Sequence, residues 1–266
     1  MIRREERKCR TRRVQAALGI ALALAGCAGE TKDDAAPLLV LAASDLQAAF
    51  EEILPLFEAH TGERVSLVLG STGNLATQIR NGAPGDLFFA ANESFLEELI
   101  VAGRVDPDTR RIYALGRLVL VAPPGRDTPS KVTSLAAPGF EIVAIANPEH
   151  APYGIAARDA LERAGLWDWI QPRLVLGENI SQAYQLVRTG NADAGIVALG
   201  LVMGAPGGPV PYALVGSELH APLRQAAGVV TGSRRPEFAQ AFLDLVLSPE
   251  GQEIMARFGF EPPPAP

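Results

Sequence analysis

The chain has 266 residues, of which 48% are hydrophobic, and its 30 acidic and 24 basic residues give a formal net charge of -6. A chain of this length and apolar content can bury one large or two medium-sized cores. Its acidic balance argues against nucleic-acid binding, which depends on basic side chains that neutralise phosphates.

The first 26 residues have the pattern of an export signal. Seven basic residues fall within residues 3–13, and an apolar stretch follows at residues 14–25. This stretch is shorter than the roughly 20 apolar residues that a membrane span needs. It ends in Leu24-Ala25-Gly26-Cys27, which resembles the bacterial lipoprotein processing box, in which the cysteine becomes the lipidated first residue. The alternative is an ordinary secretory signal with an incidental cysteine.

Loss of residues 1–26 would remove seven positive and two negative charges and change the net charge from -6 to -11. Cys9 would leave with the signal and Cys27 would carry lipid, so no cysteine would remain for a disulfide. We therefore expect the mature protein in the periplasm or cell envelope, anchored to a membrane by lipid. The polar residues 27–37 would form the tether.

From residue 38 onward, short apolar runs alternate with helical patterns. In chain order the predictions are strand 38–43, helix 46–62, strand 65–69, helix 74–80, strand 87–90, helix 94–102, strand 117–122, strand 142–146, helix 154–164, strand 174–176, helix 181–188, strand 195–198, a loop at 204–211, strand 225–230, and helices 238–247 and 252–258. Such alternation indicates βαβ units and parallel sheets. The Pro-Pro-Gly at 123–125 interrupts the pattern, and we interpret it as the crossover into a second lobe.

The predicted fold is therefore α/β with two lobes, each a mainly parallel sheet flanked by helices. We assign residues 38–118 and 228–266 to lobe 1 and residues 119–227 to lobe 2. The strand at 225–230 would return the chain to the first lobe.

Two turns between an apolar run and an amphipathic segment carry small hydroxyl residues. They are Ala43-Ser44-Asp45 and Gly70-Ser71-Thr72-Gly73-Asn74. The first N–H groups of a helix have no intrahelical partner and the helix dipole is positive there, so an anion can be held without Lys or Arg. Two such turns that face each other could encircle a small oxyanion.

Five short segments, in order along the chain, resemble the substrate-binding protein of the molybdate ABC transporter. They are LAASDL at 41–46, GSTGNL at 70–75, GAPGDLF at 82–88, NPEHAPYG at 147–154 and GENI at 177–180. The resemblance covers nearly all of residues 38–260. It implies a two-lobed periplasmic-binding fold of type II, with the ligand in the cleft and closure about a hinge.

The resemblance also implies a set of ligand-binding residues. The first lobe supplies the hydroxyls of Ser44, Ser71 and Thr72, and the second lobe supplies the backbone N–H groups of Tyr153 and Ile180. The sequence does not say how Ser71 and Thr72 share the contact.

The chain departs from part of the family at one position. Some members supply a tyrosine hydroxyl where this sequence has Ala198, and others supply it from the segment that contains Tyr153. We therefore expect Tyr153 to supply the tyrosine hydroxyl that contacts the oxyanion.

The expected function is capture of molybdate, and of tungstate, which is nearly equal in size and charge, for an inner-membrane ABC permease. The resemblance implies a monomer with no cofactor, no nucleic-acid partner and no direct metal ligand, because the ion is bound through its oxygens. A pocket of O–H and N–H donors suits a dianion that only accepts hydrogen bonds. Such a pocket should reject hydrogen phosphate, whose proton would lack an acceptor, while sulfate must be rejected by pocket size.

Two alternatives stay open from the residues alone. The binding fold could serve another anion, such as sulfate, phosphate or a small organic anion. An envelope serine hydrolase would need Ser44 or Ser71 paired with His150. The sequence has no G-x-S-x-G, H-E-x-x-H or nucleotide-binding motif, so we predict that it is not an enzyme.

Several of these residues also have a purely structural interpretation. Ser44 and Asp45 could cap the following helix, with the Asp45 N–H still free to donate. Ser71 and Thr72 could shape their turn, Tyr153 could be a surface aromatic, and His150 could be structural or face solvent.

Overall fold

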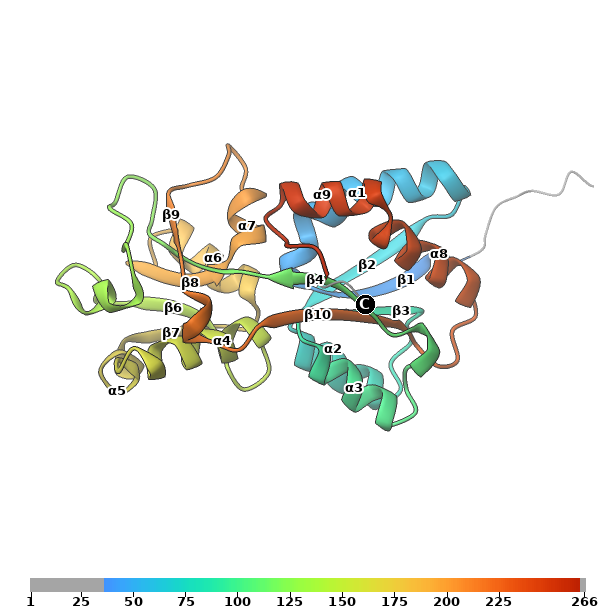
Figure 1. Cartoon of the computed structure of the whole chain (residues 1–266), viewed down its shortest axis with the longest axis horizontal. Helices are drawn as coiled ribbons and strands as arrows, with labels where there is room; N and C mark the ends of the chain where they lie inside the picture. Colours follow the sequence, from blue (N-terminus) through green and yellow to red (C-terminus); the bar gives the residue numbers. More distant parts are fainter. Residues whose placement is uncertain (1–35, 264–266) are drawn as a thin grey trace, which may run out of the picture. The chain divides into compact units, whose positions relative to one another are not determined.

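The computed structural model describes residues 36–263, whose strands form two five-stranded sheets (Figure 1). The predicted signal at 1–26, Cys27 and most of the predicted tether lie outside the described residues. No helix within the described part of the chain is long and apolar enough to cross a bilayer.

The first sheet contains three strands from the start of the chain and two from later segments. Its order is β2 (Val65–Gly70), β1 (Leu38–Ala43), β3 (Leu87–Ala90), β10 (Leu223–Val229) and β4 (Arg111–Gly116). β1 runs parallel to β2 and β3, whereas β10 runs antiparallel to β3 and β4.

Helices cover both faces of this sheet, on opposite sides in Figure 1. They are α1 (Gln47–Thr61), α8 (Pro236–Leu247) and α9 (Pro249–Arg257) on one face, and α2 (Thr72–Arg80) and α3 (Glu93–Val101) on the other. Val40 of β1 packs toward the first group and Leu41 toward the second. Because successive side chains of a strand point to opposite faces, a strand covered on both sides must be apolar throughout.

The second sheet has the same kind of topology. Its order is β7 (Leu174–Gly177), β6 (Val143–Ala146), β8 (Ala194–Ala198), β5 (Leu118–Val121) and β9 (Tyr212–Leu214). β6 runs parallel to β7 and β8, and β5 runs antiparallel to β8 and β9. The helices of this part are α4 (Pro152–Arg163), α5 (Trp167–Ile170), α6 (Ile180–Arg188) and α7 (Leu199–Met203).

The predicted α/β architecture with two lobes, each a mainly parallel sheet flanked by helices, is confirmed, with one strand of each sheet running against the other four. The cause is the same in each: one strand that enters from the other sheet, β10 or β5, pairs antiparallel with both neighbours. A periodicity pattern reveals a strand but not its direction, so the sequence did not show this.

The chain passes between the sheets at two places that differ from the predicted lobe boundaries. Arg117 alone separates β4 from β5, where we predicted one strand at 117–122. β10 begins at Leu223, so the predicted boundary between 227 and 228 falls inside a strand of the first sheet. β4 was not predicted, although residues 112–115 form a short apolar run between Arg111 and Gly116.

Three helices begin one or two residues before their predicted starts. α2 begins at Thr72, α4 at Pro152 and α6 at Ile180. The shift places each of these residues in the first turn of a helix, where backbone N–H groups lack intrahelical partners.

Candidate functional site

Four segments that begin helices meet around one small cavity. Its lining consists of Ala43, Ser44, Asp45, Gly70, Ser71, Thr72, Ala91, Ala151, Pro152, Tyr153 and Ile180. All five residues predicted to bind the oxyanion are in this set, and none of the lining residues has a cationic side chain. The structure thus brings together residues from both sheets that lie far apart in the sequence.

The cavity is narrow in this arrangement. The centre of a water-sized sphere has about 10 Å³ to move in, which is space for about one water molecule. An oxyanion with four oxygens is larger, so its entry requires the walls to separate.

Backbone N–H groups at the helix starts supply donors to this region. The first intrahelical hydrogen bonds are donated by Leu75 N in α2, Ile155 N in α4 and Ala183 N in α6. Pro152 has no N–H, so Tyr153 provides the first donor of α4. The N–H groups of Tyr153 and Ile180 precede those first bonds, which leaves them available to an anion.

The three hydroxyl residues are all buried but differ in their contacts. Thr72 Oγ1 accepts a hydrogen bond from Ala91 N at 3.1 Å, which ties α2 to the end of β3. Ser44 Oγ lies 3.4 Å from Ser181 N, and Ser181 Oγ donates to Ser44 O at 3.0 Å. Ala43, not Ser44, is the N-cap of this short helix, and the Ser44 hydroxyl contacts α6 of the other lobe.

Several hydrogen bonds join the two layers across the cavity. Gly73 N donates to His150 O at 2.9 Å, and Ser71 Oγ donates to the same carbonyl at 2.8 Å. Asn74 Nδ2 donates to Glu178 Oε1 at 2.5 Å. These contacts hold the cleft in a closed arrangement, with α2 against the start of α4 and the loop before α6.

His150 is therefore an interlobe contact rather than a solvent-facing residue. Its Nδ1 lies 2.8 Å from Ser71 Oγ, so the pair considered for a hydrolase does meet. However, Ser71 Oγ donates its proton to the His150 carbonyl, and no carboxylate hydrogen-bonds the imidazole within residues 36–263. A serine nucleophile needs a base that accepts the hydroxyl proton and a group that orients the base.

A buried polar network lies directly behind Tyr153. Gln225 Nε2 donates to Asp45 Oδ2 at 2.7 Å and to the Tyr153 hydroxyl at 3.0 Å. Asp45 is 1% exposed and Gln225 is fully buried. Among the described residues, Asp45 Oδ1 and Gln225 Oε1 have no hydrogen-bond partner. The Tyr153 oxygen accepts from Gln225, which leaves its own O–H free to donate.

Burial dominates the protonation of this network. It raises the pKa of the Asp45 carboxyl to about 6, and the nearby Gln225 amide and Tyr153 hydroxyl offset part of that rise. Burial, together with the Asp45 charge, raises the pKa of the Tyr153 and Tyr113 phenols well above their ordinary value. Both phenols are therefore neutral donors at neutral pH.

The structural interpretation of Asp45 as a helix cap is wrong. Its side chain caps no helix and instead accepts from Gln225, 180 residues away. Gln225 was missed altogether, because nothing local in the sequence distinguishes a strand glutamine that pairs with a distant carboxylate.

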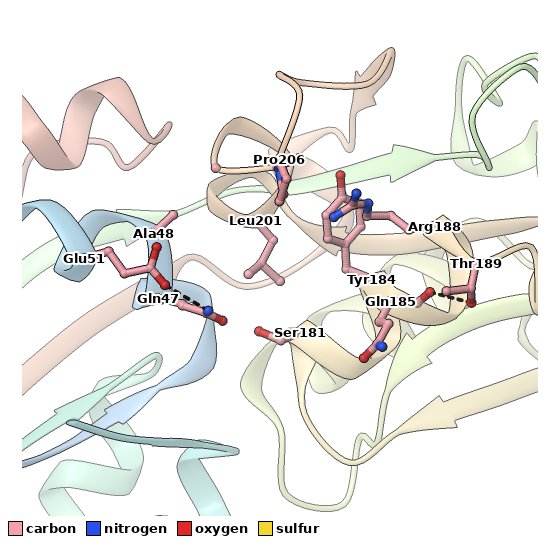
Figure 2. A pocket seen from close by; sticks show the side chains of 12 residues that line it. Gln47, Ala48, Glu51, Ser181, Tyr184, Gln185, Arg188, Thr189, Leu201 and Pro206 are labelled. Atoms are coloured by element: carbon pink, nitrogen blue, oxygen red, sulfur yellow. Dashed lines mark hydrogen bonds between the residues drawn. The ribbon is translucent and has the colours of Figure 1, made fainter. Parts of the chain in front are cut away.

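A much larger groove lies beside the cavity, between α1 and the helices α6 and α7 (Figure 2). Its volume is about 570 Å³. Two of its lining residues are hydrogen-bonded to a residue four positions earlier: Glu51 Oε1 accepts from Gln47 Nε2, and Thr189 Oγ1 donates to Gln185 O. None of the predicted ligand residues lines it. Size alone would favour this groove, but the small cavity is the one that all five predicted ligand residues line.

No group of three or more His, Cys, Asp or Glu side chains within residues 36–263 could hold a metal ion.

Comparisons with known proteins agree with the resemblance. A family model described as bacterial extracellular solute-binding protein matches residues 38–261. ModA, the molybdate-binding protein of Rhodobacter capsulatus, is 34% identical over 244 residues, which cover 92% of this chain and 93% of that protein. The putative ABC transporter substrate-binding lipoprotein YvgL of Bacillus subtilis is 30% identical over 251 residues, 92% of this chain and 95% of that protein.

A solved structure extends the similarity to the fold. The periplasmic molybdate-binding protein of Azotobacter vinelandii superimposes with a TM-score of 0.79 and 31% identity, covering 85% of this chain and 100% of that chain. Proteins of this family bind solutes and are not enzymes, which confirms the prediction made from the missing catalytic motifs and rules out the hydrolase. The chain belongs to the bacterial extracellular solute-binding proteins and is a relative of the molybdate-binding proteins of ABC transporters.

Proposed function

We propose that this protein captures molybdate in the cavity between its two sheets and presents it to the membrane permease of an ABC importer. The convergence of buried hydroxyls and helix N-termini on a site without cationic side chains carries the proposal. Tungstate, nearly equal in size and charge, would bind the same donors. The periplasmic location given for the relative of known structure supports an extracytoplasmic site of action.

The donor set is large enough for tight binding. A hydrogen bond to a charged group contributes roughly 1.5–3 kcal/mol, and nanomolar affinity requires about 12 kcal/mol. About four to eight donors therefore suffice. We assign the hydroxyls of Ser44, Ser71, Thr72 and Tyr153, and the backbone N–H groups of Thr72, Tyr153 and Ile180, to this role. Thr72 Oγ1 accepts from Ala91 N and keeps its own O–H free, whereas Ser71 Oγ donates to His150 O, so we assign the larger share of hydroxyl donation to Thr72.

Closure of the two lobes would be the signal that the permease recognises. We propose that the lobes move about Arg117 and residues 215–222, the two connections between the sheets. The hydrogen bonds of His150 with Gly73 and Ser71 would form on closure and break on release. The protein would act as a monomer and without a cofactor, because both walls of the cavity come from one chain.

A second oxyanion, hydrogen phosphate, is favoured by one observation. The cavity is not lined by donors alone, because the buried Asp45 carboxylate is an acceptor. An ionised Asp45 could accept the proton of hydrogen phosphate, so the argument that a donor-only pocket rejects phosphate holds only while Asp45 is protonated.

Isothermal titration of the purified protein with molybdate, tungstate, sulfate and phosphate separates these ligands. We expect tight one-to-one binding of molybdate and tungstate, and no heat of binding for the other two. If phosphate binds and molybdate does not, hydrogen phosphate is the ligand of this site. Silence for all four would contradict an oxyanion receptor.

We also propose that Cys27 anchors the mature protein to a membrane through lipid. The processing box around it supports this, as does the lipoprotein name of the Bacillus subtilis relative. Replacing Cys27 with alanine is expected to move the protein from the membrane fraction to the soluble fraction of the envelope and to abolish labelling by a fatty-acid analogue. Cys9→Ala is the matched control and should leave both unchanged. Persistent lipid labelling of Cys27→Ala would refute the anchor.

A further inference from the structure

The Asp45 carboxyl is a buried acid at the proposed anion site, and no cationic group of residues 36–263 lowers its pKa. It lines the same cavity as the proposed ligand residues. Its Oδ2 accepts from Gln225, and its Oδ1 has no partner among the described residues. A carboxylate in this position would repel a dianion, and nothing in its surroundings screens that repulsion.

The two titratable groups that interact with Asp45 are neutral. Tyr153 on α4 hydrogen-bonds with Asp45, the Asp45 charge raises the pKa of Tyr113 on β4, and burial keeps both phenols protonated. The helices α1 and α6 also contact the short helix that carries Asp45, and neither contributes to its pKa. Gln225 on β10 is uncharged, and on α7 the backbone at Gly200 lies near the Asp45 carbonyl. The protonation of Asp45 is therefore free to respond to a ligand.

We propose that Asp45 makes oxyanion binding proton-linked: its carboxyl is ionised in the free protein at neutral pH and takes up one proton from solvent when the dianion enters the cleft. This inference rests on the proposed oxyanion function. The proton goes to Oδ1, the oxygen without a donor, while Oδ2 keeps the Gln225 amide. Asp45 thereby changes from a repulsive charge to a neutral neighbour of the ligand.

The same network prepares the Tyr153 hydroxyl. Both hydrogens of the Gln225 amide are used, one on Asp45 and one on the Tyr153 oxygen. The Tyr153 O–H then has two possible acceptors, the Asp45 carboxylate and the oxyanion. Protonation of Asp45 removes the first, so the phenol donates to the ligand.

The free carboxyl has a pKa of about 6, which sets the pH range of the effect. A bound dianion raises the pKa of Asp45 further, so the complex holds more protons than the free protein above that pH. Affinity must then fall as pH rises, by up to about tenfold per pH unit where one proton is taken up. Below the free pKa the carboxyl is already protonated, and this dependence disappears.

Calorimetric titration of the purified protein with molybdate between pH 6 and pH 9 tests the proposal. We expect the wild-type Kd to rise with pH, by up to about a hundredfold between pH 6 and pH 8. Titration at pH 8 in buffers of different ionisation enthalpy should show uptake of close to one proton per molybdate. Asp45→Asn, which cannot ionise, should show a flat Kd, no proton uptake, and tighter binding than wild type at pH 8.

Two comparisons identify the group that causes any dependence of Kd on pH. Glu51→Gln removes an exposed carboxylate from the neighbouring helix α1 and should keep the wild-type slope. His150, which contacts Ser71, and Glu178, which accepts from Asn74, also carry ionisable side chains at the cleft. A slope that persists in Asp45→Asn would assign the effect to a group other than Asp45 or to the ligand and overturn the inference.

Failure of this inference differs from failure of the proposed function. Tight molybdate binding without proton uptake by the wild-type protein would contradict the role of Asp45 alone, whether or not the variant folds. Absence of molybdate binding at every pH would contradict the proposed function. Phosphate that binds most tightly at high pH would show Asp45 acting as an acceptor for a ligand proton, which also overturns the inference.

Discussion

Replacing Gly73 with alanine is expected to weaken molybdate binding by about 2–4 kcal/mol, roughly 30-fold to 1,000-fold, without destabilising the fold. A Cβ at this position would lie 2.5 Å from His150 O and 3.0 Å from His150 Cα. Both are atoms of the opposite lobe, and backbone cannot move aside as a flexible side chain could. The added methyl group would therefore block closure and break the hydrogen bond from Gly73 N to His150 O.

Stability should respond in the opposite direction to affinity. Gly73 lies in the first turn of α2, and alanine is usually favoured over glycine in a helix by roughly 0.5–1 kcal/mol. Chemical denaturation without ligand should show an unchanged or slightly higher free energy of unfolding. Thr77→Ala, an exposed change on the same helix, is the control and should leave affinity unchanged. A Gly73→Ala variant that binds as tightly as wild type would show that the closed contacts are not part of the bound state.

Replacing Tyr153 with phenylalanine is expected to weaken molybdate binding by roughly 1–3 kcal/mol, about fivefold to 150-fold. The change removes one donor to the oxyanion and leaves one hydrogen of the buried Gln225 amide without its acceptor. The ring stays, so packing should be preserved. Titration calorimetry at pH 6, where repulsion from Asp45 is weakest, measures the loss most cleanly.

Tyr212→Phe provides the matched control for this change. Tyr212 lies on the edge strand β9 and is 41% exposed, so loss of its hydroxyl should leave affinity unchanged. Equal affinities of Tyr153→Phe and wild type would remove the Tyr153 hydroxyl from the site, while the backbone N–H of Tyr153 would remain a candidate donor.

The sequence predicted those parts of the site that depend on local structure. Ser44, Ser71 and Thr72 lie in turns between an apolar strand and a helix, a pattern that can be recognised within a few residues, whereas Tyr153 and Ile180 were implied by the family resemblance. The structure brings all five to one cavity. Their contact with a ligand stays a prediction.

The rest of the site depends on contacts between distant segments. Asp45 had the local features of a helix cap, yet its partner Gln225 lies on β10. His150 was considered only as a base, a structural residue or a solvent-facing one, yet its backbone carbonyl accepts from both Gly73 and Ser71. No periodicity or turn pattern reports such pairings, because they arise only when the two sheets face each other.

The same limit explains the errors in topology. The strand β10 was predicted within two residues of its start, but its antiparallel direction and its place between β3 and β4 were not. Direction follows from the chain's return out of the second sheet, which residue patterns within one strand do not encode.

Crystals grown with molybdate, measured on both sides of the molybdenum absorption edge, test the central claim most directly. The account predicts one anomalous peak in the cavity among Ser44, Ser71, Tyr153 and Ile180, with the ligand oxygens facing the starts of α2, α4 and α6. A peak in the larger groove of Figure 2, or none at the small cavity, would contradict it.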